Sequence, residues 1–253
     1  MTISPKFDAR IGGKTITIDR EKTRWPRFSD AEYDRRHDLV RNFMREKELD
    51  CLLIGGGETH YGKGWTNIRW VSNYYDYAAY AYVVFPLEGE PTICCWFNNP
   101  HDLAASVIDD VRAEYDTSKI AVNRLKELGL ENGKIAVVAH CTSTPRDHYE
   151  TFLKELPDAK FQFIFEDFMR IRWQKSAEEI ERLEIAGELG DLAIKAIATK
   201  LRPGMKEYDL FSIAYSSILA NGGEPRLMLL ASDSMRDPIR APSVHIQDIR
   251  PMP

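Results

Sequence analysis

The side chains best suited to binding a substrate or a partner gather in one aromatic segment, which runs from Trp65 to Tyr80. Arg, Trp and Tyr are the residue types enriched at the dominant positions of protein interfaces, because they bury a large surface and keep a polar group for hydrogen bonding. We therefore expect this segment to face a substrate or a partner, with ordinary packing in a strand or core as the alternative. The residues concerned are Arg69, Trp70, Tyr74, Tyr75 and Tyr77.

Five of the six histidines show no spacing typical of a metal site. A zinc site needs three or four ligands that converge on one point, usually in closely spaced pairs. We interpret these five histidines as structural or surface residues. They are His37, His60, His101, His140 and His148.

Two further motifs have plain structural interpretations. The glycine run Gly55-Gly56-Gly57 lacks the G-x-x-x-x-G-K-[ST] pattern of a phosphate-binding loop, so we expect a turn after a strand. The pair Asp109-Asp110 is expected on the solvent-exposed face of a helix.

Composition excludes several functional classes. The 253 residues include 34 Lys and Arg against 39 Asp and Glu, a formal net charge of -5, which argues against a nucleic-acid partner. No uninterrupted apolar run approaches the roughly 20 residues of a membrane span, and the first residues do not resemble a signal peptide. The four cysteines lie in apolar surroundings without a CxxC pair, as expected for reduced thiols in a cytoplasmic protein.

Alternating short elements predict an α/β domain with a mixed sheet over residues 1–165. Residues 1–28 are expected to form an irregular arm, and a capping box at Ser29 is expected to begin a helix. The remaining expected elements are strands at 51–54, 80–85, 92–97, 134–139 and 160–165 and helices at 99–115, 118–128 and 144–156. The strands at 80–85 and 92–97 are expected to form a hairpin.

The pattern changes in the second region, residues 166–253. Ser176 and Glu179 form a second capping box, and apolar residues then recur every three or four positions as far as Leu201. A second helix is expected at 207–220 and a strand at 226–231. Two helices and a strand cannot close a core of their own, so we expect a second copy or another segment to cover them.

Two stretches resemble a known family. Residues 172–183, RWQKSAEEIERL, and residues 201–210, LRPGMKEYDL, are together similar to the opening of the pita-bread catalytic domain of creatinase, prolidase and aminopeptidase P. Residues 67–70, NIRW, resemble an Asn-Ile-Arg-Tyr strand in the N-terminal domain of the same family. The resemblance covers about residues 29–253.

The resemblance implies a fold and an activity. The fold is a ribonuclease-H-like mixed-sheet domain, followed by an α+β pita-bread domain that is truncated here. The activity is metal-dependent hydrolysis of C–N bonds, by an Xaa-Pro peptidase or a creatinase-like amidinohydrolase acting on a small molecule or short peptide. Because some members of the family dimerise, the resemblance also implies that this chain forms a homodimer.

The resemblance also implies a cofactor, two divalent metals (Mn, Co or Zn) held by five ligands in a full-length member, since carboxylates must neutralise two neighbouring cations. Residues 248–253 resemble the segment just before the first ligand. We therefore expect no metal ligand and no cofactor in this chain, and no activity from it alone.

Creatinase works without metal and relies on a histidine that precedes the first-ligand position, which implies His245, the closest candidate in this chain, as a catalytic residue. The alternative is a loop histidine. A second function class also stays open, a non-catalytic binding or scaffold protein on the same fold.

Overall fold

The computed structural model describes residues 3–22, 27–56, 63–74, 80–96, 99–139, 144–225 and 228–231. The chain divides into two compact units, Met1–Gln174 and Lys175–Pro253. The expected boundary at residue 165 falls at the first residue of a short helix, α6 (Phe165–Ile171), whose Phe168 packs in the core of the first unit.

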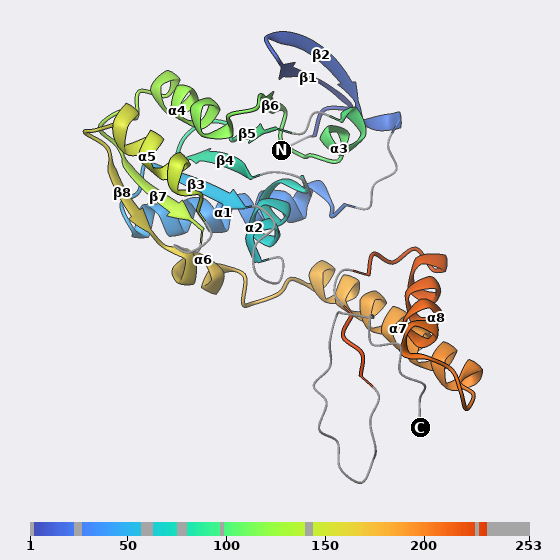
Figure 1. Cartoon of the computed structure of the whole chain (residues 1–253). Helices are drawn as coiled ribbons and strands as arrows, with labels where there is room; N and C mark the ends of the chain where they lie inside the picture. Colours follow the sequence, from blue (N-terminus) through green and yellow to red (C-terminus); the bar gives the residue numbers. More distant parts are fainter. Residues whose placement is uncertain are drawn as a thin grey trace. The chain divides into compact units, whose positions relative to one another are not determined.

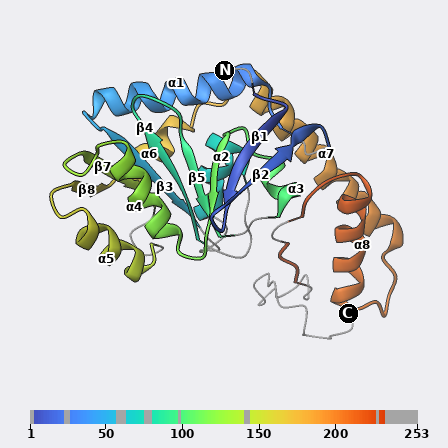
Figure 2. The same cartoon turned by 90° about the horizontal axis from the view of Figure 1, so that it is seen from above.

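The first unit is built on an eight-stranded mixed sheet in the order β2-β1-β6-β5-β4-β3-β7-β8 (Figure 1, Figure 2). Neighbours pair antiparallel within β1–β2 and β3–β4–β5, and parallel elsewhere. The strands are β1 (Lys6–Ile11), β2 (Lys14–Asp19), β3 (Cys51–Gly56), β4 (Ala81–Pro86), β5 (Thr92–Cys95), β6 (Asp110–Ala113), β7 (Lys134–Val138) and β8 (Lys160–Phe163).

Helices cover both faces of this sheet, with α4 and α5 on one side and α1, α2 and α6 on the other (Figure 1). Side chains alternate across β3, so Leu52 and Ile54 join one core cluster while Cys51 and Leu53 join the second. The helical elements are η1 (Arg20–Lys22), α1 (Asp30–Glu46), α2 (Lys63–Ser72), α3 (Pro100–Ala104), α4 (Thr117–Glu127), α5 (Arg146–Glu155) and α6.

The predicted hairpin of β4 and β5 is confirmed, as are β3, β7 and β8 and the helices α1, α4 and α5. The irregular arm predicted for residues 1–28 is wrong, because β1 and β2 form a hairpin there. Phe7, Ala9 and Ile11 alternate into the core, and Gly12 and Gly13 take the positive φ angles that a tight turn requires.

The helix predicted at 99–115 is also wrong beyond Ala104. Residues Asp110–Ala113 instead form β6, which lies between β1 and β5 and buries Val111 and Ala113. Asp110 is therefore not on a helix face: its carboxylate accepts a hydrogen bond from Thr92 Oγ1 at 2.7 Å. Asp109 pairs with Arg20 at 2.7 Å.

The strand expected at residues 67–70 is a helix, α2. Ile68 and Val71 bury the same helical face, and Ser72 Oγ donates to the Ile68 carbonyl at 2.6 Å. The helix ends at Ser72, and Asn73, which follows it, adopts a left-handed φ of 56°. Packing against the sheet has overridden the β-propensity of this apolar stretch.

The described part of the second unit forms two helices, α7 (Ala177–Lys200) and α8 (Glu207–Ala220), as predicted. The capping box is present, since Ser176 Oγ accepts from the Glu179 amide and Glu179 Oε2 accepts from the Ser176 amide, both at 3.0 Å. Of the strand predicted at 226–231, residues 226–227 lie outside the described part, and 228–231 contain an isolated bridge at Leu230. None of the described helices is both long and apolar enough to cross a membrane.

Candidate functional site

The structure places three of the predicted site residues around the end of α2. Arg69 and Trp70 belong to the last turn of α2, and Tyr74 follows it. Tyr75, Tyr77 and His245 lie outside the described residues. The described members therefore come from one short segment near one face of the sheet.

Trp70 and Tyr74 are core residues in this unit, with 7% and 0% of their surfaces exposed. The Trp70 ring lies 5.2 Å from the Arg36 guanidinium and packs edge-on against Phe168 at 6.2 Å. These contacts favour the core-packing alternative for both residues. Arg69 is partly exposed, so it is the described member of the set best placed to meet another molecule.

Arg36 forms a buried ion pair within α1 and also holds α2 to α1. Arg36 is 1% exposed, its Nε lies 2.7 Å from Glu32 Oε1, and its Nη1 donates to the Trp70 carbonyl at 2.9 Å. Arg35 also binds the Glu32 carboxylate, at 2.8 Å. The Ser29 side chain caps the helix as predicted, and the Glu32 carboxylate binds Arg35 and Arg36. The E-x-x-R-R spacing, which puts these charges three and four residues apart on a helix, is the sequence signal for these pairs.

A second arginine joins α2 to the end of α6. Arg172 Nη1 donates to Asn67 Oδ1 and to Thr66 Oγ1, and its guanidinium lies over the Trp70 ring at 5.7 Å. Asn67 is buried, and within the described part of the chain its Nδ2 has no hydrogen-bond acceptor. The residues of the NIRW stretch thus fix the point at which the chain leaves the first unit.

A tyrosine–histidine cluster lies where β3 ends and β4 begins. Tyr82 Oη lies 3.1 Å from His148 Nδ1, and the Tyr80 ring contacts both side chains. Burial raises the pKa of the Tyr82 phenol well above its usual value and lowers the pKa of His148. Sequence reasoning missed this cluster, because Tyr82 and His148 are 66 residues apart.

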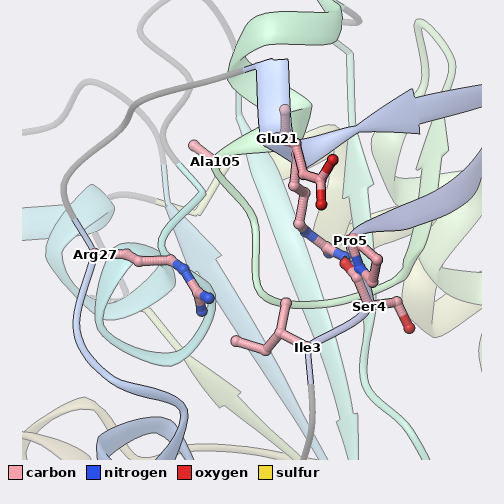
Figure 3. A pocket seen from close by; sticks show the side chains of 8 residues that line it. Ile3, Ser4, Pro5, Glu21, Arg27 and Ala105 are labelled. Carbon is pink, nitrogen blue, oxygen red and sulfur yellow. The ribbon is translucent and has the colours of Figure 1, made fainter.

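A small cavity of about 240 Å³ lies between the N-terminal segment and the loop after α3 (Figure 3). Its charged arginines already have partners: Arg20 Nη1 bonds Asp109, and Arg27 Nη1 bonds Asp30 at 2.8 Å. We interpret the cavity as a packing gap between two segments of the fold rather than as a binding site. Its lining is Ile3, Ser4, Pro5, Arg20, Glu21, Arg27, Ala104 and Ala105.

The described residues do not fit a metal pair. Across them, no group of three or more His, Cys, Asp or Glu side chains could hold a metal ion. His37, for example, binds the Val71 carbonyl through Nε2 at 2.8 Å, and burial lowers its pKa. A ring nitrogen that donates to a buried carbonyl serves packing rather than coordination.

The creatinase/prolidase N-terminal domain family matches residues 36–173, which is more than half of the chain. The chain therefore belongs to this family. A search of curated proteins found no match.

Solved structures show the same fold. The chain is similar to dipeptidase PepE from Mycobacterium ulcerans, at 20% identity and a TM-score of 0.65 over 90% of this chain and 59% of that one. It is also similar to a prolidase from Pyrococcus horikoshii OT3, at 20% identity and a TM-score of 0.57 over 74% and 49%. A third similar structure is an Xaa-Pro dipeptidase from Bacillus anthracis, at 17% identity and a TM-score of 0.58, over 75% of this chain and 50% of that one.

This chain thus spans about half to three fifths of the length of those proteins. The predicted fold class, a mixed-sheet N-terminal domain followed by the start of the pita-bread domain, is confirmed.

Proposed function

We propose that this chain is the front part of a hydrolase of C–N bonds, of the Xaa-Pro peptidase or creatinase-like kind. The family match supports the first unit, and three similar structures are named as a prolidase or dipeptidases. The observation that carries the proposal is the likeness to dipeptidase PepE, which covers 90% of this chain but only 59% of that protein. That coverage exceeds the first unit and includes part of the second.

In this proposal the first unit is a scaffold and the chemistry belongs to a complete catalytic domain. Two divalent metals (Mn, Co or Zn) would supply a Lewis acid and an activated water there. The described residues of this chain offer no ligand set for them. We propose accordingly that the 253-residue chain alone is inactive, and that His245 and Arg69 contribute only within a complete site.

The partner in this proposal is a second copy of the chain. The second unit leaves apolar side chains of α7 in water, with Leu183 58% and Ile194 67% exposed. Exposed apolar patches on rigid elements mark interaction surfaces. The buried thiols of Cys51, Cys94 and Cys95 fit the reducing conditions of the cytoplasm.

The test is a comparison of two polypeptides, this chain and the longest product of its gene. Both are assayed for hydrolysis of Gly-Pro and of creatine with Mn²⁺, Co²⁺ or Zn²⁺. We expect turnover from the longer product and none from this chain. A longer product that binds no metal and turns over neither substrate would favour the scaffold alternative.

A further inference from the structure

The edge strand β2 offers a regular row of backbone groups for pairing. It lies at one end of the sheet and, among the described strands, pairs with β1 alone (Figure 2). All six of its residues pair with β1 in one antiparallel register, and the first four of them are exposed. An exposed edge of this kind is a template to which another strand can add through main-chain hydrogen bonds.

The register of the hairpin determines which backbone groups of β2 face outward. The Arg20 amide, directly after β2, donates to the Pro5 carbonyl at 2.9 Å, so this position points toward β1. Alternate residues of an antiparallel strand bond to the same neighbour, so the even-numbered residues of β2 also bond to β1. The amides and carbonyls of the odd-numbered residues therefore point away from the sheet. These are Thr15, Thr17 and Asp19.

β2 lacks the features that usually prevent strand addition. Natural edge strands are protected by a proline, a bulge, a charge in the middle of the strand or a very short length. The unbroken pairing with β1 leaves no bulge in β2, and its central residues, Thr15 to Ile18, are uncharged and β-branched. The opposite edge strand, β8, has four residues that begin with Lys160, and α6 follows it closely.

We propose that β2 pairs antiparallel with β2 of a second copy of the chain, with the two-fold axis at Thr17. In this register Thr17 lies opposite Thr17 of the second copy, Thr15 opposite Asp19, and Ile16 opposite Ile18. All the outward backbone groups of β2 thereby gain partners. Ile16, which is 39% exposed, gains an apolar neighbour on the sheet face where Ile18 joins the core.

The sequence of β2 favours a second copy as the added strand, because a two-fold interface must be complementary to itself. The axis at Thr17 matches apolar with apolar residues on one face and threonine with threonine or a carboxylate on the other. An axis at Ile16 would place Lys14 opposite Ile18 and Asp19 opposite Gly13 of the turn. An axis further along would require pairing by residues of η1, which are not extended.

The pairing involves only the first unit. It depends neither on the proposed hydrolase activity nor on the exposed face of α7. Failure of the pairing and failure of the proposed function are therefore distinguishable, because the tests below measure association without any assay of turnover.

Cross-linking of the whole chain tests the position of the axis. A hydrogen-bonded antiparallel pair has its Cα atoms about 5.5 Å apart, within the range of a disulfide. Under mild oxidation we expect most of the Thr17→Cys variant to become a covalent dimer, with the bond between the two introduced thiols. Thr15→Cys is the matched control, since position 15 is also exposed and outward-facing but lies opposite Asp19. It should give little covalent dimer.

Two substitutions at one position test the role of the outward amide. Thr17→Pro removes an N–H that is not used by β1, so it should abolish association and keep the hairpin. Thr17→Val keeps the N–H and should associate like the wild type. Both variants lose the hydrogen bond from Thr17 Oγ1 to Asp8, which lies at 2.7 Å, so this loss cannot account for a difference between them.

Amide exchange of the unmodified chain gives a test that needs no variant. In concentrated solution the amides of Thr15 and Thr17 should be protected, and dilution should remove this protection. The amides of Ile16 and Ile18, which bond to β1, should keep theirs at every concentration. Unprotected Thr15 and Thr17 amides at all concentrations would overturn the proposal, as would equal cross-linking of Thr15→Cys and Thr17→Cys or wild-type association of Thr17→Pro.

Discussion

The two units of this chain bury their apolar side chains to very different extents. In the first unit, every residue of β3 and β4 is buried, because helices cover both faces of the sheet. In the second unit, the buried apolar residues among those described are Ala193, Leu210 and Ala214. Both units have well-formed helix caps, so the comparison shows that local signals suffice to make a helix but not to make a core.

The largest loss of stability is expected when the buried ion pair of the first unit is broken. Glu32→Ala leaves the Arg36 guanidinium buried without its carboxylate, which should lower the free energy of unfolding by about 3–5 kcal/mol. Chemical denaturation measures this. The control is Glu150→Ala, which removes an exposed pair with Arg146 and should change stability by no more than about 1 kcal/mol. Equal effects from the two variants would contradict the assigned burial.

A glycine in each unit sharpens the comparison. Gly55→Ala in β3 forces its Cβ against Tyr80 and Tyr82 and should cost about 1–3 kcal/mol. Gly187→Ala in α7 meets no atom within 4 Å and should instead stabilise the helix, by about 0.5–1 kcal/mol. Thermal unfolding followed by circular dichroism checks both signs. A loss of helix stability in Gly187→Ala would mean that this face of α7 is covered.

The capping box should matter more to the second unit, because the described residues of that unit bury few apolar side chains. Ser176→Ala removes the acceptor of the Glu179 amide and should cost about 1 kcal/mol. The loss should show as faster amide exchange at the start of α7. Ser216→Ala, at an exposed position inside α8, should leave exchange unchanged or slightly slower.

The smallest effect on folding is expected at the exposed face of α7, where substitution should affect association instead. Ile194→Glu should change the stability of a single copy by less than about 0.5 kcal/mol. If a second copy covers this face, the variant should lower the mass measured by light scattering. Lys195→Glu, at the adjacent exposed position, is the matched control. A wild-type mass that is monomeric at every concentration would remove the second copy from the proposal.

Much of the fold could be predicted because local signals carry it. The caps at Ser29 and Ser176 and the apolar runs of β3 and β7 act within a few residues. The elements that were missed depend on distant partners: β6 has only four residues and exists through pairing with β1 and β5. In the same way, the NIRW stretch is helical because of what it packs against.

The candidate site was harder to predict for a related reason. Residue type identified Trp70 and Tyr74 as large amphipathic side chains, but type alone does not distinguish a core position from an interface. Trp70 is placed in the core by its contacts with Arg36 and Phe168, which come from other helices, and Tyr74 is fully buried. The His148–Tyr82 contact joins segments that have no common motif, so the sequence offered no pattern from which to infer it.

The most direct test of this contrast is amide exchange across the whole chain, combined with light scattering on the same sample. A self-sufficient first unit predicts slow exchange in β3, β4 and β7. A second unit whose described helices bury few apolar side chains predicts fast exchange along α7 and α8 in the monomer, and slower exchange only where a larger mass is measured. A monomer in which α7 exchanges as slowly as β3 would contradict the account.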